Sequence, residues 1–294
     1  MPDLPSPTAA PTAAATTSPS SAAASASPAV PPANPAQTPA DRAATSANRA
    51  AGSARRSATR GGPAIVVALP GTGSDAHFAR RAFGSACAAV DLPFLAVDPD
   101  PRRVIESYRA ALDAAARSGP ILIAGISLGA AVAVDWAAAH PDSVYGVIAA
   151  LPAWTGADTT GCPAALSAAA TAAQLRADGL DAMLTRMRES SPAWLADALT
   201  RSWTSQWPDL PAALEEAAAY AWPEPDLLAR VTAPVEIIGA TDDPVHPFAV
   251  AERWTALIPH ATLHTITLDE LGADPSILGT RGLNALLPRR VPAP

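Results

Sequence analysis

From Gly62 onward the sequence alternates short apolar runs with longer helical stretches, and this alternation restricts the possible folds more than any other feature. The apolar runs that we expect to form strands are residues 64–69, 94–97, 121–124, 144–149, 235–238 and 262–268. The expected helices cover residues 76–90, 102–117, 128–139, 247–257 and 275–286. Continuous apolar strands separated by helices are typical of a parallel sheet covered on both faces. We therefore predict an α/β fold with a mostly parallel sheet of about six strands.

Two segments depart from this alternation. Residues 1–62 consist almost wholly of Pro, Ala, Ser and Thr, so they cannot bury enough apolar surface to offset their ordering entropy, and we predict a disordered tail. Residues 153–225 read as helical without a strand, with helix breaks before Pro192 and Pro208. We predict that this second segment is a helical cap inserted into a core made of residues 63–152 and 226–294.

The cap segment contains five of the seven tryptophans, namely Trp154, Trp194, Trp203, Trp207 and Trp222. We expect most of them to pack inside the cap and one or two to line an apolar pocket.

Composition excludes several classes of function. The 20 basic residues are all arginine, which removes lysine Schiff-base chemistry and the P-loop lysine. The net charge of −7 argues against nucleic acid as the main partner. Cys87 and Cys162 have no spacing that suggests a disulfide framework or a zinc site, and no metal or organic cofactor is implied. No apolar run approaches the roughly 20 residues of a membrane span, so we expect a cytoplasmic protein. Nothing in the sequence indicates an oligomeric state.

Residues 125–129, Gly-Ile-Ser-Leu-Gly, lie directly between the apolar run 120–124 and the Ala-rich stretch 130–139. A serine between two glycines at a strand-to-helix turn is typical of the nucleophile elbow, in which a tight backbone turn lifts the hydroxyl clear of the sheet. Small flanking residues prevent clashes at such a turn. The motif predicts that Ser127 is a nucleophile in acyl chemistry.

Three further motifs follow in a recognisable order. Residues 69–73 (Leu-Pro-Gly-Thr-Gly) come after the first strand, residues 140–144 (His-Pro-Asp-Ser-Val) lead into the fourth, and residues 239–247 follow the penultimate strand. With these motifs, residues 64–287 resemble the α/β-hydrolase superfamily, of the type with a helical cap. The resemblance implies an oxyanion hole formed by the backbone N–H groups of Thr72 and Leu128, and a catalytic acid in the loop after the penultimate strand.

Two neighbouring carboxylates compete for the role of the acid. Asp243 is followed by Pro-Val-His-Pro, which matches the family pattern, whereas Asp242 matches better when residues are counted from Gly239. We favour Asp243. The other aspartate would then be a loop residue or cap the helix that starts near Pro247.

The catalytic base is the point at which the family pattern fails. Family members carry a histidine in the loop after the last strand, but residues 269–275 contain none. His246 and His77 both lie on the expected side of the sheet, and we rank His246 first although its closeness to Asp243 in sequence is unfavourable for bridging acid and nucleophile. We assign the other histidines structural positions: His140 in the lead-in motif, His260 on the surface and His264 on a packing face.

The sequence therefore predicts a serine hydrolase, similar to a carboxylesterase or thioesterase, that acts on a small or medium ester or thioester with an apolar acyl part. Its partner is a small-molecule acyl substrate. The alternative is a non-catalytic or catalytically impaired α/β-hydrolase-like binding protein. The choice depends on whether a histidine reaches the hydroxyl of Ser127.

Overall fold

The six strands found in the described part of the chain form one parallel sheet. The computed structural model describes residues 62–287, so the predicted tail lies outside the described residues except for Gly62, as does the end of the predicted core beyond residue 287. The strand order is β2-β1-β3-β4-β5-β6. Their bounds are β1 Val66–Leu69, β2 Phe94–Ala96, β3 Ile121–Ile126, β4 Val144–Ala150, β5 Val235–Ala240 and β6 Ala261–Ile266. The predicted α/β fold with a parallel sheet of six strands is confirmed.

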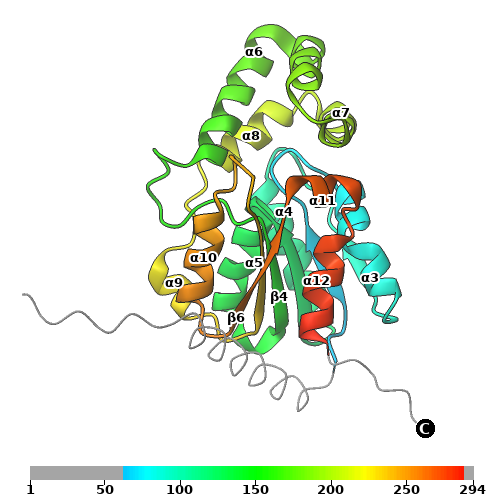
Figure 1. Cartoon of the computed structure of the whole chain (residues 1–294), viewed down its shortest axis with the longest axis vertical. Coiled ribbons are helices and arrows are strands. Elements are labelled where there is room, and N and C mark those ends of the chain that lie inside the picture. The colour runs from blue at the N-terminus through cyan, green and yellow to red at the C-terminus, as the bar shows by residue number, and fades with distance from the viewer. Residues whose placement is uncertain (1–61, 288–294) are drawn as a thin grey trace, which may run out of the picture. The chain divides into compact units, whose positions relative to one another are not determined.

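Helices cover both faces of the sheet (Figure 1). One face packs against α4 (Val104–Ala116), α5 (Leu128–Ala139), α9 (Pro225–Ala229) and α10 (Phe248–Leu257). The other packs against α2 (Ala76–Ala79), the π-helical turn η1 (Arg80–Gly84), α3 (Ser85–Ala88), α11 (Leu268–Ala273) and α12 (Ile277–Leu286). Alternate residues of each central strand enter the two apolar clusters: Ile121 and Ile123 of β3 face one, Leu122 and Ala124 the other. The strands β1, β3 and β4 are continuously apolar because both of their faces are buried.

The segment after the last strand differs from its prediction. Residues 269–275, expected to be a loop, are largely the helix α11. Thr267 ends the strand region and caps this helix, since its hydroxyl accepts from the N–H of Glu270 while the Glu270 side chain accepts from the N–H of Thr267. This capping box is a sequence pattern, Thr-x-x-Glu, that marks the start of a helix.

Four helices lie between β4 and β5. The last of them, α9, packs on the sheet, and we call the first three the helical insertion: α6 (Pro163–Ser190), α7 (Ala193–Gln206) and α8 (Leu210–Ala218). The helix ends fit the breaks expected before Pro192 and Pro208. The insertion has its own apolar cluster, which includes Leu175, Trp203 and Leu214. That residues 153–225 form a separate cap on a core of residues 63–152 and 226–294 stays a prediction.

The tryptophans are distributed differently from the expectation. Only Trp203 belongs to the cluster of the insertion itself, whereas Trp222 and Trp154 pack with the main core. The reason is their position, because these two residues flank the helices where the chain leaves and rejoins the core. Trp194 packs with the cluster on the α12 side of the sheet, and Trp207 is exposed.

Candidate active site

Ser127 occupies a strained turn between β3 and α5. Its backbone has φ 52° and ψ −114°, a combination that costs free energy for any residue other than glycine. A side chain on Gly125 would collide with the backbone of Gly129, and one on Gly129 would collide with the carbonyl groups of Leu69 and Pro70. The glycines therefore allow β3, α5 and the end of β1 to approach closely enough to form this turn.

His246 lies between Ser127 and Asp243 and forms a hydrogen bond with each. Its Nε2 is 2.9 Å from the Ser127 hydroxyl oxygen, and its Nδ1 is 2.7 Å from a carboxylate oxygen of Asp243. Because an ionised carboxylate can only accept, Nδ1 carries the imidazole proton and Nε2 of the neutral ring is left to accept from the serine hydroxyl. These three side chains are thus connected in the order Ser127, His246, Asp243.

A tight turn allows His246 to bridge Asp243 and Ser127, although His246 follows Asp243 by only three residues. The second carboxylate oxygen of Asp243 accepts from the backbone N–H groups of Val245, at 2.8 Å, and of His246, at 3.1 Å. The turn brings the chain back on itself, so that residues 243 and 246 become neighbours and the imidazole projects beyond the carboxylate toward the end of β3. The short sequence separation of Asp243 and His246, which we considered unfavourable, is therefore no obstacle in this loop conformation.

The environment of Asp243 keeps its carboxylate ionised. Burial raises the pKa of this group, but the hydrogen bond and charge of His246, together with the two backbone N–H groups, lower it by more. The net effect is a pKa below the usual value for aspartate. At neutral pH the side chain is therefore the hydrogen-bond acceptor that the arrangement requires.

The competing candidates lie elsewhere. Asp242 accepts at 2.8 Å from the backbone N–H of Leu268 and so joins the loop after β5 to the start of α11. His77 is exposed in α2, and within residues 62–287 it forms no hydrogen bond with Ser127. Of the two histidines ranked from the sequence, the one that contacts the serine is His246.

The remaining histidines have other surroundings. The ring of His140 stacks on Trp136 with a centroid distance of 4.2 Å. His264 of β6 forms a 2.7 Å hydrogen bond with the buried Glu236 of β5. His260 precedes β6, and its carbonyl accepts from the N–H of Val235.

The loop after β1 lies beside the serine. A Cβ atom added to Gly71 would be 3.5 Å from Cβ of Ser127. The N–H of Ser74 donates to the carbonyl of Gly71 at 3.0 Å, which closes a turn with Gly73 at φ 67°. Positive φ at the third position is typical of a type II turn, which leaves the N–H of the second residue, Thr72, outside the turn. The N–H of Leu128, in the first turn of α5, has no acceptor within its helix.

Neither a metal centre nor a membrane span is found in the described part of the chain. Residues 62–287 contain no group of three His, Cys, Asp or Glu side chains that could hold a metal ion. None of the helices between these residues is long and apolar enough to cross a membrane.

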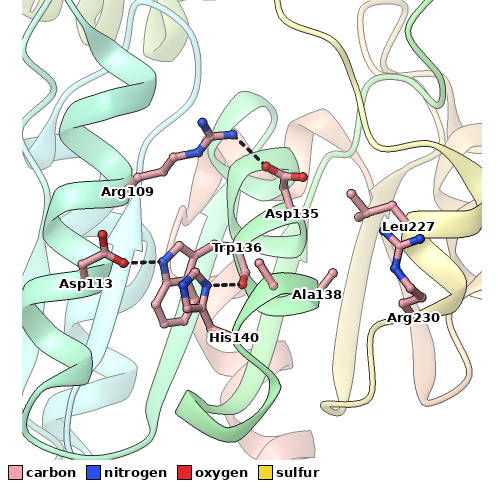
Figure 2. Close-up of a pocket in the computed structure, with 9 residues that line it drawn as sticks. Arg109, Asp113, Asp135, Trp136, Ala138, His140, Leu227 and Arg230 are labelled. Atoms are coloured by element: carbon pink, nitrogen blue, oxygen red, sulfur yellow. Dashed lines mark hydrogen bonds and ion pairs between the residues drawn. The ribbon is translucent and has the colours of Figure 1, made fainter.

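A pocket of about 280 Å³ lies at the far end of α5 (Figure 2). Four of the lining side chains form pairs: Arg109 with Asp135 at 2.8 Å, and the indole of Trp136 with Asp113 at 2.8 Å. The pocket lining includes His140, which follows α5, whereas Ser127 precedes this helix of 12 residues. The two ends are roughly 18 Å apart at 1.5 Å per residue. This pocket is therefore separate from the hydrogen-bonded group at Ser127.

Solved structures identify the fold. No protein-family model and no curated protein matches the sequence. BpoC from Mycobacterium tuberculosis H37Rv is similar with a TM-score of 0.59 at 17% identity, over 78% of this chain and 94% of that one. An esterase from Exiguobacterium antarcticum gives 0.55 at 17% identity, over 70% and 84% of the two chains. An enol-lactonase from Burkholderia xenovorans LB400 gives 0.54 at 14% identity, with the same coverage. The chain has the α/β-hydrolase fold.

Proposed function

We propose that the protein is a serine hydrolase in which Ser127 is the nucleophile, His246 the general base and Asp243 the acid that orients the base. The observation that carries the proposal is the hydrogen-bonded series from Ser127 through His246 to Asp243. A serine hydroxyl is a poor nucleophile near neutral pH unless an adjacent base accepts its proton, and this series supplies that base. The likeness to an esterase and an enol-lactonase agrees with the proposal at the level of the fold.

In the first half of the reaction, the Ser127 oxygen bonds to the carbonyl carbon of the substrate while its proton passes to Nε2 of His246. The carbonyl π electrons move to the oxygen, and the N–H groups of Thr72 and Leu128 stabilise this oxyanion. Collapse of the intermediate breaks the bond to the alcohol or thiol, which leaves with the proton from His246. Water then repeats the same steps on the acyl-enzyme and releases a carboxylic acid.

For the substrate, we propose a small or medium ester or thioester with an apolar acyl part. Support comes from the helical insertion, because α7 reaches the loop after β1 and its Trp203 lies against Gly73 of that loop. The Trp203 atom nearest Gly73 is the indole nitrogen, whereas the rest of the ring belongs to the apolar cluster of the insertion. A mostly apolar side chain beside the proposed oxyanion hole favours an apolar acyl chain over a charged one.

A fluorophosphonate probe tests the proposal directly, because it forms a covalent bond only with an activated serine. We expect the wild-type protein to be labelled, Ser127→Ala to be unlabelled, and Ser118→Ala, which changes an exposed serine in a turn, to be labelled like the wild type. Likewise, the wild type and Ser118→Ala should hydrolyse a p-nitrophenyl ester, and Ser127→Ala should not. Folding of each variant is checked by circular dichroism.

Two results would contradict the proposal. One is a folded wild-type protein that neither reacts with the probe nor hydrolyses short-chain esters, which would favour the non-catalytic binding protein. The other is labelling that persists in Ser127→Ala, which would move the nucleophile to another residue.

A further inference from the structure

The loop after β1, residues 70–75, is held at both of its ends by side chains from outside it. At its start, the buried hydroxyl of Tyr108 in α4 donates to the carbonyl of Pro70 at 2.9 Å. At its end, the contacts come from α7 of the helical insertion, which lies at the same end of the sheet as α11 (Figure 1). The loop that carries Thr72 is therefore attached to the insertion as well as to the core.

Three polar side chains of α7 contact three consecutive residues of this loop. The Ser202 hydroxyl donates to the carbonyl of Gly73 at 2.7 Å, and the Gln206 amide donates to the carbonyl of Ser74 at 2.9 Å. Arg201 lies 3.4 Å from the carboxylate of Asp75. Ser202 and Gln206 are four residues apart, so they lie on one face of the helix.

The two side chains that donate to carbonyl groups of the loop, Ser202 and Gln206, are buried. Ser202 is 1% exposed and Gln206 is 7% exposed, and polar groups at such depth lower stability unless they are hydrogen-bonded. Beside them, Trp203 packs so closely that a Cβ atom on Gly73 would be 2.9 Å from its indole nitrogen. The loop and this face of α7 are thus fitted to each other, with donors of the helix matched to carbonyl groups of the loop.

These contacts fix the orientation of peptide planes. The carbonyl of Gly73 shares its plane with the N–H of Ser74, which closes the turn on Gly71. A hydrogen bond that holds this carbonyl therefore also holds the turn, and the turn determines the direction of the Thr72 N–H. The same turn places Gly71 against Ser127.

We propose that Ser202 and Gln206 are positioning residues for the oxyanion hole, through which the helical insertion sets the direction of the Thr72 N–H. This inference rests on the proposed function, since it assigns the loop a role in stabilising the oxyanion. Neither residue touches the reacting atoms, and both act through the backbone of the loop.

The test compares Ser202→Ala with Ser205→Ala, which removes a hydroxyl from the same helix. The Ser205 hydroxyl donates to the carbonyl of Ser202 within α7, and in the described chain it forms no hydrogen bond with residues 70–75. Gln206→Met provides a second variant of similar side-chain length without the amide. Each protein is assayed for kcat and KM with a p-nitrophenyl ester and for inhibition by a trifluoromethyl ketone. Attack of Ser127 on that ketone forms a tetrahedral oxyanion, with the serine proton on His246.

We expect Ser202→Ala and Gln206→Met to lower kcat by about tenfold with KM changed less than about twofold. The reason is that the Thr72 N–H binds the oxyanion, which forms only as the transition state is reached. Inhibition by the ketone should weaken by the same factor as kcat/KM. Ser205→Ala should match the wild type in both assays. A residue with only a structural role would lower the melting temperature without this parallel loss.

The inference is overturned if both loop variants keep wild-type kcat, or if the loss appears in KM while ketone inhibition is unchanged. When the wild type reacts with the fluorophosphonate probe, these results leave the proposed function standing. A wild-type protein that fails to react with the probe overturns the proposed function and this inference together.

Discussion

At the residue scale, the central feature is that the proposed acid and base belong to one turn. Asp243 accepts hydrogen bonds from both the ring and the backbone N–H of His246, and the ring extends from there to Ser127. The neighbouring Asp242 accepts from the N–H of Leu268 instead, so the two adjacent carboxylates have different hydrogen-bond partners. The lowered pKa of Asp243 follows from its partners rather than from its exposure.

Substitution of the proposed base is the sharpest test at this scale. We expect His246→Gln to reduce kcat/KM for a short ester by roughly 10³-fold or more, because Ser127 then has no group to accept its proton. His77→Gln should retain wild-type kcat/KM, since that side chain is exposed in α2. Steady-state kinetics on both variants decide between the two histidines. Equal activity of His246→Gln and the wild type would remove His246 from the mechanism.

At the element scale, Glu236 of β5 and His264 of β6 form a pair across neighbouring strands, away from the proposed chemistry. Their 2.7 Å hydrogen bond joins a carboxyl group that is 3% exposed to a partly exposed imidazole. Burial raises the pKa of Glu236, and the hydrogen bond and charge of His264 offset this effect only in part. The folded protein therefore binds the Glu236 proton more tightly than the unfolded chain does.

This raised pKa predicts the sign of a pH effect on stability. A raised folded-state pKa stabilises the protein below the unfolded value, about 4.3 for glutamate, and the stabilisation is lost as pH rises through the folded-state pKa. We expect the free energy of unfolding of the wild type to fall relative to that of Glu236→Gln as pH increases through this range. Urea denaturation from pH 4 to 7 measures the difference.

The matched control is Glu252→Gln, which removes the same charge from an exposed site on α10. Its stability relative to the wild type should change little with pH in this range. A wild-type protein that gains stability relative to Glu236→Gln as pH rises would show that the sign is wrong.

The elements themselves were largely predictable, because their signals are local. The buried strand before Ser127 and the helix after it follow from apolar runs and flanking glycines, and α5 spans the predicted residues 128–139. The start of helix α11 does not emerge from the sequence prediction because its capping box is divided there, with Thr267 in the expected strand 262–268 and Glu270 in the expected loop 269–275. The approach of His246 to Ser127 depends on a backbone turn at residues 243–246, which residue identities alone do not specify. The contacts of Ser202 and Gln206 depend on helix packing, which periodicity does not give.

At the scale of the whole described chain, the helical insertion and the sheet-covering helices share polar contacts. The N-cap of α4, Arg103, provides no side-chain cap. Instead, the carboxylate of Glu216 in α8 accepts from the N–H groups of Val104, at 2.6 Å, and Ile105, at 3.2 Å. A residue of the insertion thus satisfies the first turn of a helix that packs on the sheet.

We expect Glu216→Ala to lower the free energy of unfolding by about 0.5–2 kcal/mol, the range for loss of a helix cap. Glu215→Ala is the matched control. The Glu215 carboxylate is exposed and pairs with Arg176 inside the insertion, so its loss should lower the free energy of unfolding by less. Urea denaturation measures both variants. Equal losses in the two would show that the cap on α4 contributes nothing beyond a surface ion pair.

The turn that joins Asp243 to His246 has a consequence for how proteins of this kind diverge and are found. Because the proposed acid and base share one loop, their mutual spacing does not depend on the register of β6 against β5. Insertions or deletions beyond Thr267 alter the length of the C-terminal part without separating the pair. If the proposed roles hold, the C-terminal part can vary in length without loss of the base.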